Sequence, residues 1–497
     1  MIGLSVAMAC VAAAAESEAA GLLTQAMDAM GGEARLKSLR WVTLDSIGHS
    51  WALEQSVRPE GPWLSTYQQV LETRDLELQR QWIEVRQRGW ITPNWTAPPA
   101  TIVSDGVAAR TDGKRWAPGR PSDVLDMTET FALAPERLLF TARAAADLRT
   151  MPDEVQHSVS QKVLAFTWNG KRLRLFLNRW THLPSMLEVV HDDASGVWGD
   201  VVEHRWYSFW SLEKGGLLYP RQITSEINGL PNADSTVETL TIDEPLDEAK
   251  FAIPTDTRTA YQAAPARAAG IVNLRLDASK AVVVKDWIVQ LPGSFNVMLV
   301  RQPDGVVVIE ATTSGTYSQD VLQAAESRFP GVPVKAVVTT SDAWPHIGGI
   351  REYVARGIPV YALDLNVPIL TRLTSAAHTL APDTLQRQPK PPIVRPVSAR
   401  TVIGSGENRV ELAPVHGDNG ERMMIAWLPG AHLLYTSDLV QHKRAGPGFF
   451  APEMLVELEA AVSREHIEGI EQAIGMHLAP MPWGEIAKGI AQAKGSQ

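Results

Sequence analysis

The first half of the chain contains many short segments in which hydrophobic and polar residues alternate, which is the pattern of half-buried β-strands. Turn-forming pairs such as Asn169-Gly170 and Asn228-Gly229 separate several of them. The segments with this pattern are residues 41–47, 66–72, 76–85, 163–168, 172–177, 186–190, 201–209 and 222–227. A short helix is predicted ahead of them over residues 22–30, because its apolar residues recur at helical spacing and two glycines follow. The pattern predicts a mainly antiparallel β domain.

The second half of the chain begins with short apolar runs and then alternates between helix and strand signals. Residues 287–290, 297–301 and 306–310 are predicted strands, separated by turns that contain proline and glycine. A helix is predicted over residues 319–329, with Ser318 as its N-cap, followed by a buried strand over residues 334–338. A helix over residues 350–356 and a strand over residues 359–363 come next. The second half is therefore predicted to combine sheet strands with covering helices.

Length and local composition divide the chain into two predicted domains. A chain of 497 residues is longer than one hydrophobic core usually spans. Around Ala263 to Gly270 the residues become small and flexible, as in an interdomain linker. We predict a β-rich, tryptophan-rich domain over residues 19–260, a linker over 261–272 and a second domain over 273–497.

Residues 1–18 are predicted to be a secretory signal peptide. The apolar stretch is too short to span a bilayer and ends in Ala13-Ala14-Ala15, which resembles a cleavage site. A lipoprotein signal that uses Cys10 matches less well, and a buried N-terminal helix is the alternative. We expect a periplasmic or secreted protein.

Charge and cysteine content narrow the classes of partner and cofactor. The formal net charge of −10 and the lack of a long basic run argue against binding to nucleic acid or to an anionic membrane. Cys10 is the only cysteine, so a mature chain has neither a disulfide nor a thiolate ligand. Any metal must be held by histidine and carboxylate side chains. No later segment reaches the ~18 apolar residues of a transmembrane helix.

Tryptophan is concentrated in the first half, where 12 of the 16 tryptophans precede residue 211. They either pack the core and cross-strand pairs of a curved sheet, or line an apolar groove for an acyl chain or another hydrophobic ligand. A short helix that ends in Gly-Gly and is followed by long strands resembles the periplasmic lipoprotein-carrier fold. The resemblance covers residues 20–255 and implies a half-open β-barrel with an apolar interior.

The loop after the predicted strand 334–338 carries the most informative motif. Its sequence runs from Thr339 through Ser341, Ala343, Pro345 and His346 to a Gly-Gly pair. In length, and in its flanking strand and helix, the loop resembles the signature Thr-His-x-His-x-Asp-His-x-Gly-Gly of the metallo-β-lactamase superfamily. Aligned on the glycines, serine and alanine replace the first two histidines and proline replaces the aspartate. Only His346 remains.

Later loops resemble the other ligand positions of the superfamily more closely. His416 follows the apolar run 410–415, Asp438 follows the strand-like run 433–436, and His477 follows another apolar segment. Ser437 stands where a glycine is usual in the superfamily. The resemblance implies an αββα sandwich over residues 273–497, with His346, His416, Asp438 and His477 as metal ligands.

These four residues would suffice for one zinc ion rather than two, and a metal-free site is the alternative. The resemblance implies that the aspartate lost here is the residue that orients or deprotonates the attacking water in the superfamily. Asp342 is the candidate replacement, as a ligand or catalytic base, although a lone loop aspartate often only caps a turn.

Two functions follow from this sequence. The first is an exported hydrolase of the metallo-β-lactamase fold with a mononuclear metal site, acting on an unidentified small molecule by ester, thioester or phosphoester hydrolysis. The alternative is a catalytically inactive domain of this fold that serves as a binding module for an apolar ligand or an envelope component.

Overall fold

The computed structural model describes residues 18–53, 63–89, 94–193, 197–263, 274–443 and 446–495. The predicted signal peptide with Cys10, except for residue 18, and most of the predicted linker lie outside these residues. The chain forms two compact units, each described by itself below. The first comprises Met1–Ala52, Leu64–His191 and Val201–Ala269, and the second comprises Leu53–Trp63, Asp192–Asp200 and Gly270–Gln497. Both units are therefore discontinuous in sequence.

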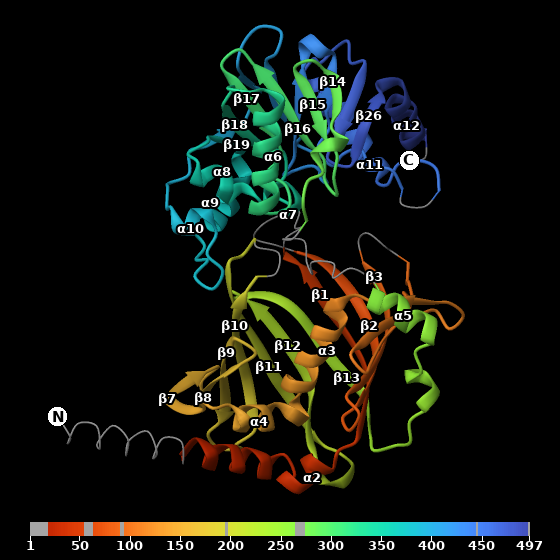
Figure 1. The fold of residues 1–497 in the computed structure, drawn as a ribbon, viewed down its shortest axis with the longest axis vertical. Coiled ribbons are helices and arrows are strands. Elements are labelled where there is room, and N and C mark those ends of the chain that lie inside the picture. Colours follow the sequence, from red (N-terminus) through yellow and green to blue (C-terminus); the bar gives the residue numbers. More distant parts are fainter. Residues whose placement is uncertain are drawn as a thin grey trace, which may run out of the picture. The chain divides into compact units, whose positions relative to one another are not determined.

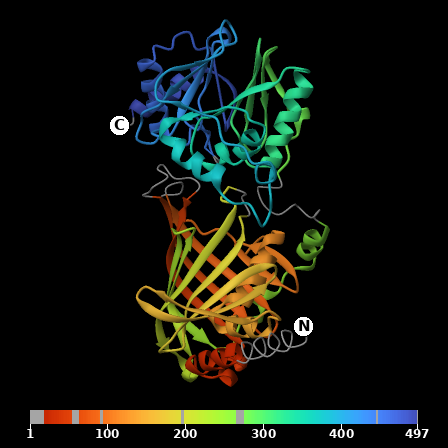
Figure 2. The ribbon, with the colours of Figure 1, turned by 90° about the vertical axis from the view of Figure 1, so that its left-hand side faces the viewer.

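The first unit is built on a single 13-stranded sheet with the strand order β6-β5-β4-β3-β2-β1-β13-β12-β11-β10-β9-β8-β7. The strands curve strongly (Figures 1 and 2). Their bounds are β1 Trp41–Ala52, β2 Leu64–Asp75, β3 Arg80–Gly89, β4 Ala100–Ser104, β5 Val107–Thr111, β6 Trp116–Pro118, β7 Arg149–Gln156, β8 Val159–Trp168, β9 Lys171–Asn178, β10 Pro184–Asp192, β11 Asp200–Leu212, β12 Leu218–Ile227 and β13 Leu230–Ile242. The sequence correctly predicted a large antiparallel sheet here.

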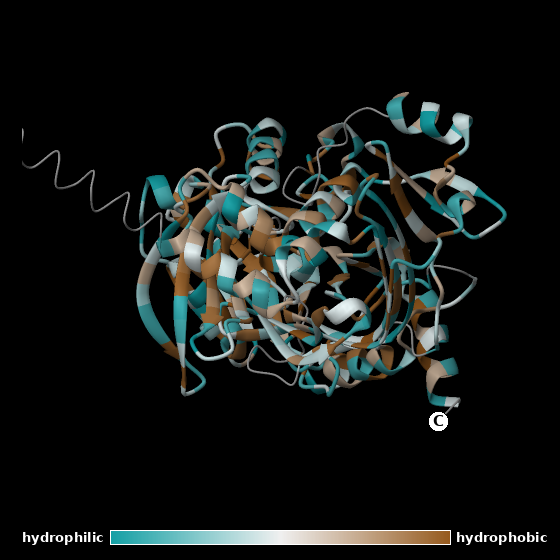
Figure 3. Ribbon diagram, turned by 90° about the horizontal axis from the view of Figure 1, so that it is seen from below, coloured by the Kyte–Doolittle hydropathy of each residue, from teal (hydrophilic) through white to brown (hydrophobic). Residues whose placement is uncertain are grey.

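Helices cover one face of this sheet and build the main core of the first unit. Residues 18–29 are helical, and they contribute Leu23 and Met27 to a core that also contains Met30 just after this helix, Leu138 of α4 (Pro135–Ala144) and Leu175 of the sheet. Viewed from below, many hydrophobic segments lie in the interior (Figure 3). The helices of this unit are α2 Glu33–Ser38, α3 Pro121–Leu133, α4 Pro135–Ala144 and α5 Thr255–Ala263.

The second unit contains two sheets. The first has seven strands in the order β14-β15-β16-β17-β18-β19-β20, and the second has six in the order β21-β22-β23-β24-β25-β26. The strands of the first sheet are β14 Val282–Lys285, β15 Ile288–Leu291, β16 Val297–Gln302, β17 Gly305–Ile309, β18 Val334–Thr339, β19 Val360–Leu363 and β20 Val394–Val397. Those of the second are β21 Thr401–Ile403, β22 Val410–Pro414, β23 Met424–Leu428, β24 Leu433–Tyr435, β25 Gln472–Gly475 and β26 Leu478–Pro482.

Two apolar clusters show how the sheets of the second unit are covered. One unites residues from both sheets, among them Val307, Val338, Leu412 and Ile474. The other joins the second sheet to α11 and α12. The helices are α6 Gly315–Arg328, α7 Trp344–Ile347, α8 Ile350–Ala355, α9 Val367–Ser375, α10 Thr384–Arg387, α11 Pro452–Arg464 and α12 Trp483–Gly495.

Several local features differ from the sequence prediction. The strand predicted over residues 76–85 begins only at Arg80, after a turn, and β4 to β7 and β13 were not predicted. Helices α3 and α4 were not predicted, and α6 begins four residues before the expected start, at Gly315. Its N-cap is Ser314, whose hydroxyl accepts the backbone N–H of Tyr317, so Ser318 lies inside the helix. Within the described part of the chain, no helix has both the length and the apolar character needed to cross a membrane.

Candidate active site

The candidate site lies at the carboxyl ends of the neighbouring parallel strands β17 and β18. Glu310 directly follows β17, and the loop that carries His346 follows β18. Because parallel strands end at the same edge of a sheet, the two side chains are brought together there. A Cβ atom on Gly349 would lie 2.0 Å from the Ser318 hydroxyl, so glycine is needed where this loop packs against α6.

His346, on the short helix α7, is the centre of the site. Its side chain is fully buried, and each ring nitrogen faces a carboxylate. Nδ1 lies 2.9 Å from Oε2 of Glu310, and Nε2 lies 2.9 Å from Oδ2 of Asp438. Since a carboxylate of Glu310 can only accept, Nδ1 carries a proton and the ring is fixed with Nε2 towards Asp438.

Asp438 connects His346 to His477, which lies between β25 and β26. Nε2 of His477 is 3.3 Å from Oδ1 of Asp438, and the His477 side chain is 31% exposed. Oδ1 is buried and accepts no hydrogen bond from the described residues. Asp438 therefore has one oxygen engaged by His346 and a second, buried oxygen beside an imidazole.

A pair of hydroxyl groups supports this arrangement from behind. Thr340 donates its hydroxyl to Glu310, and Oγ1 of Thr340 lies 2.7 Å from Oγ of Ser437. Ser437 has a left-handed backbone with φ of 52°, which favours glycine, and it directly precedes Asp438. The contact with Thr340 fixes the Ser437 side chain next to Asp438.

The charges of the site are strongly coupled. Burial lowers the pKa of His346, but the carboxylates of Glu310 and Asp438 outweigh it and raise this pKa to about 10. Burial raises the pKa of the Asp438 carboxyl, yet attraction to His346 and His477 leaves it below its ordinary value. Asp438 is therefore ionised at neutral pH.

The remaining predicted site residues lie differently. Asp342 is 5% exposed in the loop after β18. His416 is exposed, has φ of 58°, and forms no hydrogen bond or ion pair with the other predicted ligands within the described ranges. The structure therefore joins His346, Asp438 and His477 through contacts, but not His416.

Phe295 borders His477, and Trp344 packs against Phe295. The ring of Phe295, in the loop between β15 and β16, lies edge-on to Trp344 at 5.3 Å and to His477 at 5.5 Å. An apolar wall therefore lies next to His477, whose side chain is partly exposed, whereas that of His346 is buried.

The donors of this site suit a zinc ion chemically, since two imidazoles and a carboxylate are ordinary zinc ligands. Oδ1 of Asp438 is buried and accepts no hydrogen bond from the described residues, so it could also serve as a ligand. The three side chains do not form a preorganised metal site, however, because the described residues include no group of three or more His, Cys, Asp or Glu placed to hold a metal.

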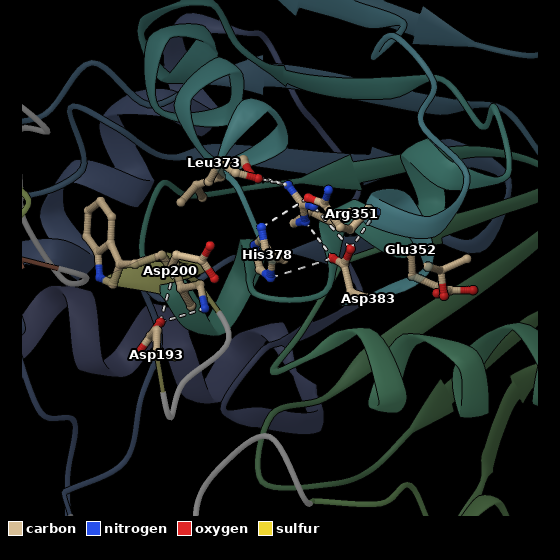
Figure 4. A network of polar contacts seen from close by, with 12 residues as sticks. Asp193, Asp200, Arg351, Glu352, Leu373, His378 and Asp383 are labelled. Carbon is tan, nitrogen blue, oxygen red and sulfur yellow. Dashed lines mark hydrogen bonds and ion pairs between the residues drawn. The ribbon is translucent and has the colours of Figure 1, made fainter. Parts of the chain in front are cut away.

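A second buried polar network in this unit is structural (Figure 4). Arg351 binds both carboxylate oxygens of Asp383 and donates to the carbonyls of Leu373, Thr374 and Ala376 at the end of α9. Such carbonyls have no partner within their own helix. Arg351 therefore caps one helix while it holds the residue that begins the next.

Reasoning from sequence missed Glu310. It directly follows a buried apolar strand and precedes the polar run Thr312 to Ser314, which is the only signal that could have identified it. Its importance comes from a partner 36 positions away in sequence (346 − 310), and the sequence pattern does not reveal that contact.

No protein-family profile and no curated protein sequence matches this chain. Similar solved structures are metallo-β-lactamase-fold proteins. The inverting sec-alkylsulfatase Pisa1 from Pseudomonas sp. is 17% identical with a TM-score of 0.33, and the match covers 43% of this chain and 40% of that one. The DIM-1 metallo-β-lactamase is 15% identical (TM-score 0.34; 45% and 99% covered). The metallo-β-lactamase from Pontibacter korlensis is 14% identical (TM-score 0.33; 43% and 98% covered).

Proposed function

We propose that the second unit is a hydrolase of the metallo-β-lactamase type, an αββα sandwich with one metal site formed by His346, Asp438 and His477. The observation that carries the proposal is the Asp438 carboxylate between two imidazoles, with one buried oxygen that accepts no hydrogen bond from the described residues. Three protein ligands and an open position are typical of catalytic zinc sites.

Glu310 orients the first ligand in this proposal. It accepts from Nδ1 of His346, so Nε2, which faces Asp438 in the structure, is the nitrogen that would bind a metal after losing its proton. Ligating histidines commonly donate their other ring N–H to a carboxylate, which fixes the ring and raises its basicity. Glu310 therefore holds His346 in position and makes it a stronger donor.

The chemistry would be hydrolysis of an ester, thioester or phosphoester in a small molecule. A zinc ion, when bound, lowers the pKa of water and polarises a carbonyl or phosphoryl oxygen. Asp342 would supply the carboxylate that takes the proton of the attacking water, since it is buried in the same loop as His346. Phe295 and Trp344 would provide an apolar wall for the substrate beside His477.

Metal content of the purified full chain tests this function. We expect about one equivalent of zinc, held by three protein ligands, and loss of that zinc in His346→Ala, Asp438→Asn and His477→Ala. His416→Ala is the matched control and should keep its zinc, because His416 is exposed and, among the described residues, no hydrogen bond or ion pair joins it to the other three. A wild-type protein that is folded but takes up no zinc, even when zinc is supplied, contradicts the proposal.

A metal-free binding module is the second candidate, and the state of His346 favours it. A histidine whose pKa is raised to about 10 between two carboxylates is a cation itself and can fill the place of a metal charge. In that case Asp342→Asn would leave ligand binding unchanged, and zinc would not stabilise the protein against heat.

We further propose that the protein is exported to the periplasm or secreted, and that the first unit is a carrier-like half-barrel. The curved sheet with helices on one face supports the second idea, with a hydrophobic ligand as the cargo. Extraction of the purified protein and mass spectrometry of any bound lipid would test it. An extract free of lipid from protein purified without detergent would count against a carrier.

A further inference from the structure

A groove on the first unit has the chemistry of a binding site, although the proposed function does not use it. Its volume is about 430 Å³, and it lies over β1, β2, β12 and β13. Val42 and Leu44 of β1 face the main core, and successive side chains of a strand point to opposite faces of the sheet. Ile47 and His49, which line the groove, are an odd number of positions from these two residues and so lie on the other face. The groove is therefore on the sheet face opposite the main core.

Strand register places the groove residues in two parallel rows. Directly opposite residues of an antiparallel pair share a face of the sheet. One row runs across β3, β2, β1 and β13 as Arg88, Tyr67, His49 and Asp234. The next row continues onto β12 and consists of Arg86, Gln69, Ile47, Thr236 and Gln222. Two arginines thus flank the groove on one side.

Aromatic rings hold the Arg88 guanidinium in place without using its hydrogen-bond donors. It lies 5.4 Å from the ring centres of both Tyr67 and Trp95, and the Arg86 guanidinium lies 5.9 Å from that of Trp95. Both arginine side chains are exposed, and no carboxylate pairs with them among the residues that the structure describes. Their N–H groups are preorganised for an external anion.

The other polar groups of the groove are partly engaged. Asp234 accepts from the backbone N–H and from Nδ1 of His49, so Nε2 of His49 is an acceptor rather than a donor. The side-chain oxygen of Gln222 accepts the Ser208 hydroxyl, which leaves the amide N–H groups of Gln222 unused. Among the described residues, Asp234 is the only carboxylate that lines the groove, and it is already engaged, so a ligand rich in acceptor oxygens fits the arginines and the Gln222 amide.

We propose that this groove binds a small molecule that carries an oxyanion, such as a phosphate or carboxylate group, on a flat ring. Arg86 and Arg88 bind the anion, because guanidinium groups pair with such oxygens through several parallel hydrogen bonds. The half-exposed rings of Tyr67 and Trp95, at 44% and 43%, contact the flat body of the ligand. A lipid headgroup and a free metabolite could both supply this chemistry.

Calorimetric titration of the full chain with phenylphosphonate tests the proposal, because this probe joins an oxyanion to a ring and resists hydrolysis. We expect saturable binding with a Kd below about 1 mM, weakened at least about tenfold in the Arg86→Gln/Arg88→Gln variant. Lys114→Gln/Arg115→Gln is the matched control, because it also removes two positive charges from the first unit and both residues are exposed, Arg115 at 88%. It should bind within about twofold of wild type.

Two further arms identify the source of the ligand and separate this site from the second unit. Asp438→Asn should bind phenylphosphonate as wild type does, so a failed metal site leaves this test intact. Sedimentation with phosphatidylcholine vesicles, with and without phosphatidylglycerol, distinguishes a lipid headgroup from a soluble ligand. Either result supports the groove if the double arginine variant loses binding. Equal Kd values in wild type and that variant, both with native melting temperatures, or no saturable binding in wild type, overturn the proposal.

Discussion

At the scale of single residues, Glu310 decides what His346 can do. A buried histidine between two carboxylates can be a fixed cation, or it can present one nitrogen to a metal once Nε2 loses its proton. Both states need Glu310 at Nδ1, 2.9 Å away. Glu310 itself is fully buried and is also bound by Thr340. It therefore belongs to the site as much as the ligands predicted from sequence.

Glu310→Gln is expected to weaken zinc binding about tenfold to a hundredfold, the usual cost of losing an outer partner of a ligating histidine. The amide oxygen can still accept from Nδ1, so the fold should persist. Competition with a chromogenic zinc chelator would measure the affinity, and circular dichroism would report the fold. Zinc affinity equal to that of wild type would show that Glu310 does not orient His346.

At the scale of elements, α8 is tied to the segment that follows it by Arg351. Its side chain is 7% exposed and binds Asp383 as well as three carbonyls at the end of α9. A guanidinium offers five donors in a rigid fork, which suits several fixed acceptors at once. This network positions the helices beyond the His346 loop rather than the site itself.

Arg351→Met should lower the free energy of unfolding by about 3 kcal/mol or more, because it leaves buried acceptors and the Asp383 carboxylate without their partner. Arg387→Met is the control in the same unit, since Arg387 is exposed and has no ion pair with any described residue. Chemical denaturation of both variants would measure the difference. A loss below about 1 kcal/mol for Arg351→Met would place the network among weak surface contacts.

At the scale of the whole molecule, stability should depend on pH through a buried histidine. His378 is 4% exposed and is faced by Arg351, Asp383, Asp200 and Asp193. Burial, and next the charge of Arg351, lower its pKa below the ordinary value of 6.5. The unfolded chain therefore binds a proton here at a higher pH than the folded chain does, and stability falls as pH decreases below about 6.5.

Unfolding free energies between pH 5 and 7 would check this effect, which amounts to at most about 1.4 kcal/mol per pH unit. His378→Asn should show a smaller decline towards low pH than wild type. His466→Asn, at an exposed position, should follow the wild-type curve. If all three proteins lose stability in parallel, the pKa of His378 in the folded protein is not lowered.

The sequence shows how many tryptophans the first half contains, but only the tertiary structure decides whether each one packs in a core or is exposed. Trp168 and Trp210 pack against the main core of the first unit, and Trp206 packs against a small cluster formed by the alternate residues Val163, Phe176 and Met186 of strands that also contribute to that core. Trp180, at the turn after β9, is 76% exposed. Composition alone could not separate these environments, because it does not say which face of a strand a residue occupies.

The sequence by itself determined the elements that local spacing and turn chemistry control. These are eight of the thirteen antiparallel strands of the first unit, the strand and helix order from β15 to β19, and the loops that carry His346, Asp438 and His477. Such features depend on neighbouring residues, so periodicity and glycine placement reveal them.

Only the tertiary structure decided which of these loops meet. It joined His346 to Asp438 and Glu310, left His416 exposed, and assigned Asp192–Asp200 to the second unit. It also aligned Arg88, Tyr67 and His49 from three strands in one row. Each of these outcomes depends on contacts between residues far apart in sequence, and their geometry is set by strand register and packing rather than by local pattern.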